Sequence, residues 1–263
     1  MTATPKEWDV TGRRVLVTGA SRGLGFAMAR ALVTGGARVA FGGRDAQRLR
    51  AAIDESAVGT TESLAVSLDV RDQESIADAV ATIEDAWGGL DVLVNNAGIG
   101  MRTVNPAFLT EPQPFWHVSE EGFTAVIDTN LTGYFRVASA VVPLFLRSGH
   151  GKIVNISMNH ATMRRRGFVP YGPSRAGAES LALIMAEDLR PHGVDVTMLL
   201  PGGATATGMI PDEVPDALRD HLLSPDVMAE PIRYLCSAAS DGVTGVRLVA
   251  TEFTEWLRAR SDR

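Results

Sequence analysis

Val15 to Gly25 read VLVTGASRGLG, an apolar run followed by a glycine-rich turn. The glycines stand at the spacing G-x-x-x-G-x-G: Gly19, Gly23 and Gly25. An amphipathic segment at residues 26–33 comes next, so this stretch predicts a strand, a tight turn and a helix. Glycines let such a turn bend sharply and approach a diphosphate, which the free amides of the first helical turn would bind. Taken alone, the pattern is equally typical of a purely structural turn.

The rest of the chain repeats this alternation. Short apolar runs predict strands at residues 37–41, 64–68, 90–94, 152–156, 195–200 and 246–249. Helical patterns lie between them, at residues 46–55, 73–87, 120–128, 131–146, 174–189 and 225–237, with Asp72 and Ser224 as N-caps. We therefore expect residues 1–263 to form one domain of the α/β class, a Rossmann-type doubly wound parallel sheet with helices on both faces. Ligands of such sheets bind beyond the carboxyl ends of the strands.

Composition narrows the class of protein. The 263 residues are 45% hydrophobic and carry a net charge of −6. This charge argues against binding to a nucleic-acid backbone and favours a small-molecule ligand. The single cysteine, Cys236, excludes an intramolecular disulfide and a cysteine-based zinc site, and we expect no metal. The apolar run at residues 137–146 is too short to span a bilayer, so we expect a soluble cytoplasmic protein without a signal peptide or membrane segment.

Seven ordered motifs between residues 12 and 250 resemble the short-chain dehydrogenase/reductase family. They are TGASRGLG at 18–25, Asp69-Val70, NNAG at 95–98, NLTG at 130–133, GKIVNIS at 151–157, Tyr171 and Pro201-Gly202. The resemblance implies an extended NAD(P)(H) cofactor. It places Ser21, Arg22 and Leu24 on the phosphates, Asp69 and Val70 at the adenine, Asn96, Ala97 and Gly98 beside the ribose, and Pro201 and Gly202 beside the nicotinamide. From the residues alone, a capping role for Asp69 and a helix-end turn at 95–98 stay open.

The choice between the two nicotinamide cofactors can be argued from charge. A carboxylate at the end of the second strand binds both ribose hydroxyls and favours NAD, whereas a 2′-phosphate requires cations. Gly43 stands at that place, Arg44 follows it, and Arg22 lies in the glycine turn. Two guanidinium groups can bind a phosphate through paired hydrogen bonds, so we predict that NADP(H) is preferred over NAD(H). The alternative is that both arginines only keep the surface soluble.

Two of the four catalytic residues that the resemblance implies are replaced. The family uses Asn, Ser, Tyr and Lys, and Asn130 and Tyr171 match. The spacing to the flanking motifs places Met158, which has no proton to donate, at the serine position. The adjacent Ser157 faces the site only if the strand bulges, since neighbouring strand residues point to opposite sides. Two further candidate donors, for which capping or surface roles stay open, are Asn159 and His160.

Arg175 stands at the lysine position, four residues after Tyr171. Its positive charge lies one helical turn away, so we expect it to favour the tyrosine phenolate and to bind the nicotinamide ribose together with Tyr171. A guanidinium does not release a proton at ordinary pH, which excludes a proton relay through that nitrogen. Because one donor to an oxyanion is worth about a hundredfold to a thousandfold in rate, we expect a slower or altered reaction.

Two segments outside these motifs are expected to shape the substrate pocket. Residues 101–118 form an extended substrate loop with three prolines, and its aromatic side chains would make an apolar wall. Residues 203–223 resemble a lid over the nicotinamide, with simple surface covering as the alternative. Arg164 to Arg166 either attract an acidic substrate group or are a solvated charge run. The resemblance implies a homodimer or homotetramer, and the predicted helices at 131–146 and 174–189 offer a dimer surface.

Three hypotheses of function follow. The first is an NADP-dependent oxidoreductase that interconverts a carbonyl and an alcohol on a small, fairly apolar substrate. In it Tyr171 is the acid and base, Asn130 organises a water chain and Arg175 is the electrostatic partner of the tyrosine. The second is a non-redox lyase or isomerase on the same scaffold, which Met158 and Arg175 motivate. The third is a catalytically silent protein that retains nucleotide binding.

Overall fold

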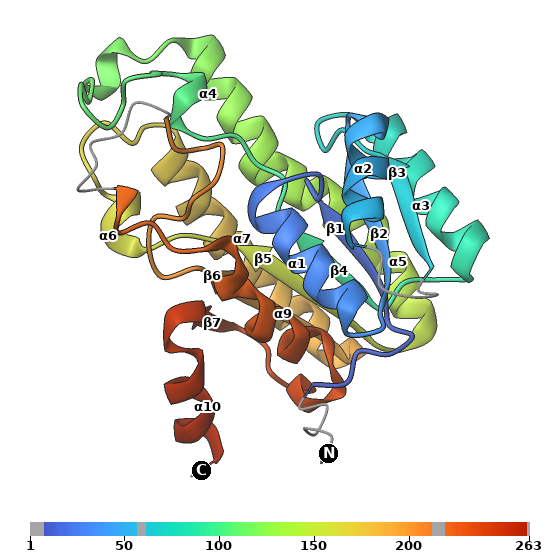
Figure 1. The fold of residues 1–263 in the computed structure, drawn as a ribbon. Helices are drawn as coiled ribbons and strands as arrows, with labels where there is room; N and C mark the ends of the chain where they lie inside the picture. Colours follow the sequence, from blue (N-terminus) through green and yellow to red (C-terminus); the bar gives the residue numbers. More distant parts are fainter. Residues whose placement is uncertain (1–7, 57–61, 212–218, 262–263) are drawn as a thin grey trace.

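The glycine stretch begins with β1, a central strand of a parallel sheet (Figure 1). The computed structural model describes residues 8–56, 62–211 and 219–261, and these form seven parallel strands in the order β3-β2-β1-β4-β5-β6-β7. The strands are β1 (Arg14–Thr18), β2 (Arg38–Gly43), β3 (Ser63–Ser67), β4 (Val92–Asn95), β5 (Gly151–Ile156), β6 (Val194–Leu200) and β7 (Val246–Val249). The chain runs outward through β2 and β3 and returns to β4 on the other side of β1. The strand order therefore reverses beside β1, where sheets of this kind bind ligands.

Helices cover both faces of the sheet (Figure 1). One face carries α1 (Gly23–Thr34), α2 (Ala46–Ser56) and α9 (Ala229–Cys236), and the other carries α3 (Gln73–Trp87), α5 (Gly133–Ser148) and α7 (Tyr171–Leu189). The described residues also form α4 (Glu120–Ile127), α6 (His160–Met163) and α10 (Phe253–Ser261). The loop that follows β4 leads into α4, and the loop that follows β5 leads into α6. Both helices therefore lie near the carboxyl ends of the strands (Figure 1).

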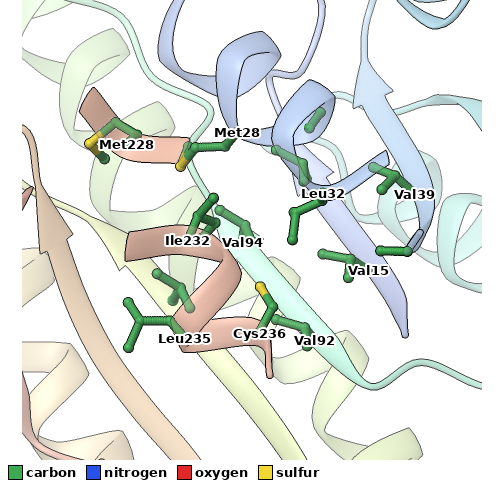
Figure 2. Close-up of a cluster of buried hydrophobic side chains, with 14 of the residues drawn as sticks. Val15, Met28, Leu32, Val39, Val92, Val94, Met228, Ile232, Leu235 and Cys236 are labelled. Carbon is green, nitrogen blue, oxygen red and sulfur yellow. The ribbon is translucent and has the colours of Figure 1, made fainter. Parts of the chain in front are cut away.

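Alternate residues of each central strand enter two different cores. In the register of β1 with β4, Val15 pairs with Val92 and Leu16 pairs with Leu93. The two valines pack with Met28 of α1 and with α9, as Figure 2 shows. The two leucines belong to the core beneath α3, α5 and α7. Because both faces are covered, all four residues are fully buried, which explains why the predicted strand at 90–94 is apolar without interruption.

The predicted fold class is confirmed, and so are most element positions. Asp72 caps α3 by accepting hydrogen bonds from the amides of Glu74 and Ser75, as predicted. The predicted helix at 225–237 is instead a 3-10 turn at Pro225–Met228 followed by α9.

The boundary of α7 differs from the prediction for a physical reason. The helix begins at Tyr171 and not at residue 174, with Pro173 inside its first turn. Proline is tolerated there because the amides of the first turn have no partner within the helix. The short helices α6 and α10 were not predicted, and residues 212–218 of the predicted lid lie outside the described residues.

Candidate active site

The glycine turn between β1 and α1 has no room for larger side chains. Gly19 has a φ of +67°, a conformation that favours glycine. A Cβ atom on Gly25 would lie 2.3 Å from the carbonyl oxygen of Gly19 and 2.4 Å from Nδ2 of Asn96. That Nδ2 donates to the backbone oxygen of Thr18 at 2.8 Å, which ties the end of β1 to the segment after β4. The bare backbone at the start of α1 therefore forms a cradle that fits a diphosphate.

The residues expected at the adenine lie just after β3. The carboxylate of Asp69 accepts two hydrogen bonds from the guanidinium of Arg71, at 2.7 and 3.1 Å. These bonds, supported more weakly by the charge of Arg44, hold the pKa of Asp69 below its usual value. Val70 is buried, and its side chain lies against Gly133 at the start of α5. The carboxylate of Asp69 therefore already binds Arg71, and Val70 provides the apolar surface at this position.

The two arginines predicted to bind a 2′-phosphate occupy different places. Arg44 directly follows Gly43, the last residue of β2, and its side chain is exposed. Nη1 of Arg22 lies 3.7 Å from the position that a Cβ atom on Gly208 would take, in the predicted lid segment. Arg44 is therefore the arginine at the carboxyl end of β2, while Arg22 extends from the glycine turn toward residues 203–211.

Asn130 is held rigidly in a π-helical turn, Asp128–Thr132, between α4 and α5. Its side chain is fully buried, its Oδ1 accepts from the amide of Ile99 at 2.9 Å, and its Nδ2 donates to the carbonyl of Ile99 at 2.9 Å. The same Nδ2 donates to Oγ of Ser174 on α7 at 3.2 Å. Single π-helical turns within α-helices often occur at functional sites. Asn130 therefore joins the segment after β4 to the helix that carries Tyr171.

Arg175 lies buried between two tyrosine rings. Its Cζ is 5.3 Å from the ring centroid of Tyr171 and 5.4 Å from that of Tyr134, a residue of α5. Its Nη1 donates to Oη of Tyr134 at 2.6 Å and to the carbonyl of Ile156 at 3.0 Å. Burial lowers the pKa of Arg175, but the two tyrosines raise it by more, so that the guanidinium stays charged. A Cβ atom on Gly98 would lie 2.5 Å from Nη2, so this glycine leaves space for the arginine.

The three candidate donors around Met158 are Ser157, Asn159 and His160, and each of them makes a hydrogen bond to another part of the protein. Oγ of Ser157 donates to Oε1 of Glu179 at 2.5 Å, and no bulge turns it inward. Nε2 of His160 lies 3.0 Å from Oε2 of the same carboxylate. Nδ2 of Asn159 donates to a backbone carbonyl just after β6 at 2.8 Å. Met158, like Tyr171, packs against an apolar cluster of Met101, Phe108 and Phe168. None of the three side chains therefore replaces the serine hydroxyl in this arrangement.

Glu179 on α7 is the centre of a charged network. Besides Ser157 and His160, Arg247 of β7 donates to it through Nε at 2.9 Å. Nη2 of Arg247 also donates to the carbonyl of Met158 at 2.7 Å. Burial raises the pKa of Glu179, but the donors from Ser157, Arg247 and His160 lower it by more, so that the carboxylate is ionised. The network fixes the backbone around Met158 to α7 and β7.

Two residues of the extended loop, Met101 and Phe108, form a buried apolar cluster with Phe168, and Tyr171 packs against this cluster. The rings of Phe108 and Phe168 meet edge to face, with centroids 5.6 Å apart, and Tyr171 packs against the cluster. Phe115 and Trp116 are 66% and 68% exposed and lie outside this cluster, whereas Phe108 of the same loop belongs to it. Their 3-10 turn, Phe115–His117, places them outward, and proline keeps this part of the loop from folding back as a helix.

The described part of the predicted lid lies over Tyr171. Sδ of Met209 is 4.0 Å from Oη of Tyr171. Nη1 of Arg102, in the extended loop, donates to the carbonyls of Gly208 and Ile210 at 3.1 and 3.3 Å. A separate cavity of about 670 Å³ lies between α1 and this segment, and Tyr171 does not line it. The loop and the lid segment are thus joined above the tyrosine.

Three other features bear on ligands. Arg164 to Arg166 are exposed, and Cζ of Arg165 lies 5.3 Å from the ring centroid of Phe168. Over residues 8–56, 62–211 and 219–261, no group of three or more His, Cys, Asp or Glu side chains is placed to hold a metal ion. In the same ranges, no helix has the length and apolar character needed to cross a bilayer.

Sequence reasoning missed three side chains of this region: Tyr134, Glu179 and Arg247. A signal for Glu179 was present, since Tyr171, Arg175 and Glu179 follow one another at four-residue steps and so share one face of a helix. Tyr134 and Arg247 carried no such signal, because their partners lie 41 and 68 residues away in the sequence.

Comparisons with known proteins agree with this geometry. The sequence model of the short chain dehydrogenase family matches residues 13–217. Gluconate 5-dehydrogenase of Gluconobacter oxydans is 37% identical over 75% of this chain and 73% of its own length. The 3-oxoacyl-acyl-carrier-protein reductase FabG of Vibrio cholerae is 30% identical over 91% of this chain and 96% of its own length. The crystal structure of the 3-ketoacyl-acyl-carrier-protein reductase of Brucella melitensis with NADH superimposes with a TM-score of 0.81, at 28% identity over 91% of this chain and 97% of that one.

Proposed function

Because this chain belongs to the short chain dehydrogenase family, we propose that it is a cytoplasmic NADP-dependent oxidoreductase that interconverts a carbonyl and an alcohol on a small, fairly apolar substrate. The observation that carries the proposal is the start of α7, where Tyr171 is partly buried and lies over the charged guanidinium of Arg175. The glycine cradle at the neighbouring strand ends supports the binding of a dinucleotide.

The residues of this chain have separate roles in the proposed reaction. A nicotinamide cofactor, when bound, would supply the hydride in reduction and accept it in oxidation. The hydroxyl of Tyr171 gives a proton to the carbonyl oxygen in reduction and takes it from the alcohol in oxidation. Arg175 stabilises the resulting phenolate by its charge, and Asn130 orders water beside α7. Because Met158 provides no second donor to the substrate oxygen, we expect turnover about a hundredfold or more below that of an enzyme with a serine there.

The test follows NADPH absorbance at 340 nm against a panel of aldehydes and ketones, together with product analysis. We expect turnover by the native chain and loss of about a hundredfold or more in the Tyr171→Phe variant, which removes only the hydroxyl. Tyr234→Phe is the matched control, because Tyr234 is a buried tyrosine of α9 in the opposite core. Turnover that survives Tyr171→Phe contradicts the assignment of Tyr171.

A second candidate function is a non-redox lyase or isomerase reaction. One observation favours it. The side chains of Ser157, Asn159 and His160 hydrogen-bond to Glu179 or to a backbone carbonyl, and none of them takes over the donor role that Met158 lacks. Substrate consumption with no change in NADPH absorbance selects this function. Tight NADPH binding with no turnover of any panel member selects a silent nucleotide-binding protein.

Cofactor preference is argued from the end of β2, where Gly43 stands and Arg44 presents an exposed guanidinium. A 2′-phosphate gains a charge-assisted partner there, and no carboxylate side chain is present at that position to bind a free 2′-hydroxyl. We expect NADPH to bind at least tenfold more tightly than NADH, a difference of about 1.4 kcal/mol. Arg44→Asp is expected to abolish or invert this preference, and an unchanged ratio of the two dissociation constants refutes it.

The substrate-binding segments follow from the same geometry. Residues 101–118 serve as the substrate loop through Phe108, and residues 203–223 serve as the lid, with Met209 against Tyr171. Together these contacts favour an apolar substrate. A homodimer is supported by exposed apolar side chains on α5 and α7: Phe135, Leu146, Leu183 and Ile184. Light scattering of the native chain beside Ile184→Glu tests this assembly, because a charge at the interface is expected to give monomers.

A further inference from the structure

We infer that Tyr134 is a positioning residue that holds Arg175 in place for the reaction. The inference rests on the proposed function of Tyr171 and adds a residue that none of the motifs contains. Tyr134 is 1% exposed on α5, and its hydroxyl accepts from Nη1 of Arg175 at 2.6 Å. The same hydroxyl lies 3.3 Å from the carbonyl of Ile156, to which it donates. Arg175, Tyr134 and the last residue of β5 therefore form one closed set of hydrogen bonds.

Charge balance makes this contact important. Arg175 is 3% exposed, and among the described residues the groups that act on its charge are tyrosines and not carboxylates. Its Nε is also buried without a hydrogen-bond partner in that part of the chain. A buried cation without a counter-ion is unfavourable unless its N–H groups are hydrogen-bonded. Each hydrogen-bond acceptor near Arg175 therefore has a large effect on the position of its guanidinium. Among the described residues, Nη1 of Arg175 donates to Oη of Tyr134 and to the carbonyl of Ile156.

The contact also sets which edge of the guanidinium faces the site. Nη1 donates to Tyr134, while Nη2 lies 2.5 Å from the position that a Cβ atom on Gly98 would take. The charge is thereby fixed 5.3 Å from the ring centroid of Tyr171. A phenylalanine at position 134 would fill the same core space but would leave Nη1 with one acceptor fewer. The hydroxyl of Tyr134 therefore acts on Tyr171 only through Arg175.

A kinetic double-mutant cycle tests this role. Tyr134→Phe is made in the native chain and in the Arg175→Lys background, which lacks the Nη1 atom that donates to Tyr134. We expect kcat to fall about tenfold to a hundredfold in the native background, as for loss of a hydrogen bond to a charged group, with KM nearly unchanged. In the Arg175→Lys background the same change is expected to lower kcat by less than about threefold. Tyr234→Phe is the control that leaves the site intact.

Two results overturn the inference. An equal loss of kcat in both backgrounds means that Tyr134 acts only through packing. No loss of kcat in the native background means that the hydrogen bond from Arg175 to Tyr134 does not position the guanidinium. A second cycle, in which urea unfolding is measured for Tyr134→Phe and Arg175→Met, tests the contact without any turnover. If the native chain reduces no carbonyl, the proposed function and the positioning role both fail, and a coupled pair in the urea cycle then identifies the contact as structural only.

Discussion

Gly25→Ala is the sharpest perturbation of the proposed dinucleotide cradle. The new Cβ atom would lie 2.3 Å from the carbonyl oxygen of Gly19 and 2.4 Å from Nδ2 of Asn96. A carbon atom and a carbonyl oxygen normally approach to about 3.3 Å, so the start of α1 and the glycine turn must separate by about 1 Å. Overpacking of this size costs about 1–3 kcal/mol. The cost falls on the backbone that is proposed to hold the diphosphate.

The expected result is a weaker complex with NADPH. Because about 1.4 kcal/mol corresponds to a factor of ten, the dissociation constant is expected to rise about tenfold to a hundredfold. The assay is a fluorescence titration of NADPH, with urea unfolding of the same preparation to measure the loss of stability. The titration is made at a temperature where the variant is fully folded.

Gly35→Ala is the matched control, because it crowds the other end of the same helix. A Cβ atom on Gly35 would lie 2.6 Å from Cγ2 of Val10, and its φ of −75° adds no backbone strain. We expect a similar loss of stability, again about 1–3 kcal/mol, without a change in NADPH binding. Equal weakening of binding in both variants, or unchanged binding in Gly25→Ala, refutes the placement of the diphosphate at this turn.

Two further predictions concern the network around Glu179. Glu179→Gln is expected to lower the free energy of unfolding by about 2 kcal/mol at pH 7, since Ser157 and Arg247 lose a charged acceptor. The folded state lowers the pKa of Glu179, so this stabilisation is complete above the unfolded pKa of about 4.3 and disappears as the pH falls through the lower folded value. Urea unfolding of both chains should show the gap closing below about pH 4, and a constant gap speaks against the assignment. Ser157→Ala is expected to change kcat by less than about twofold while costing about 1 kcal/mol of stability, and a tenfold loss of kcat would instead identify Ser157 as the missing donor.

Local sequence patterns were sufficient to predict most of the fold. The glycine turn, the cap at Asp72 and the apolar strands are each specified by neighbouring residues, through backbone conformation, a side-chain hydrogen bond or burial on both faces. The exposure of Phe115 and Trp116 could not be predicted, because an apolar side chain in a loop has no periodicity that tells which way it points. Their exposure depends on how the loop is fixed to α7 and the lid segment.

The amino-acid order alone was enough to predict a doubly wound sheet, a glycine cradle and the four-residue spacing of Tyr171 and Arg175. It was not enough to find Tyr134 beneath that arginine or to show that Ser157 binds Glu179. These contacts join residues 41 and 22 positions apart, and they exist because α5 and α7 pack on the same face of the sheet beside β5. A hydrogen bond depends on positions within a few tenths of an ångström, and only the packing of complete helices and strands sets positions that finely.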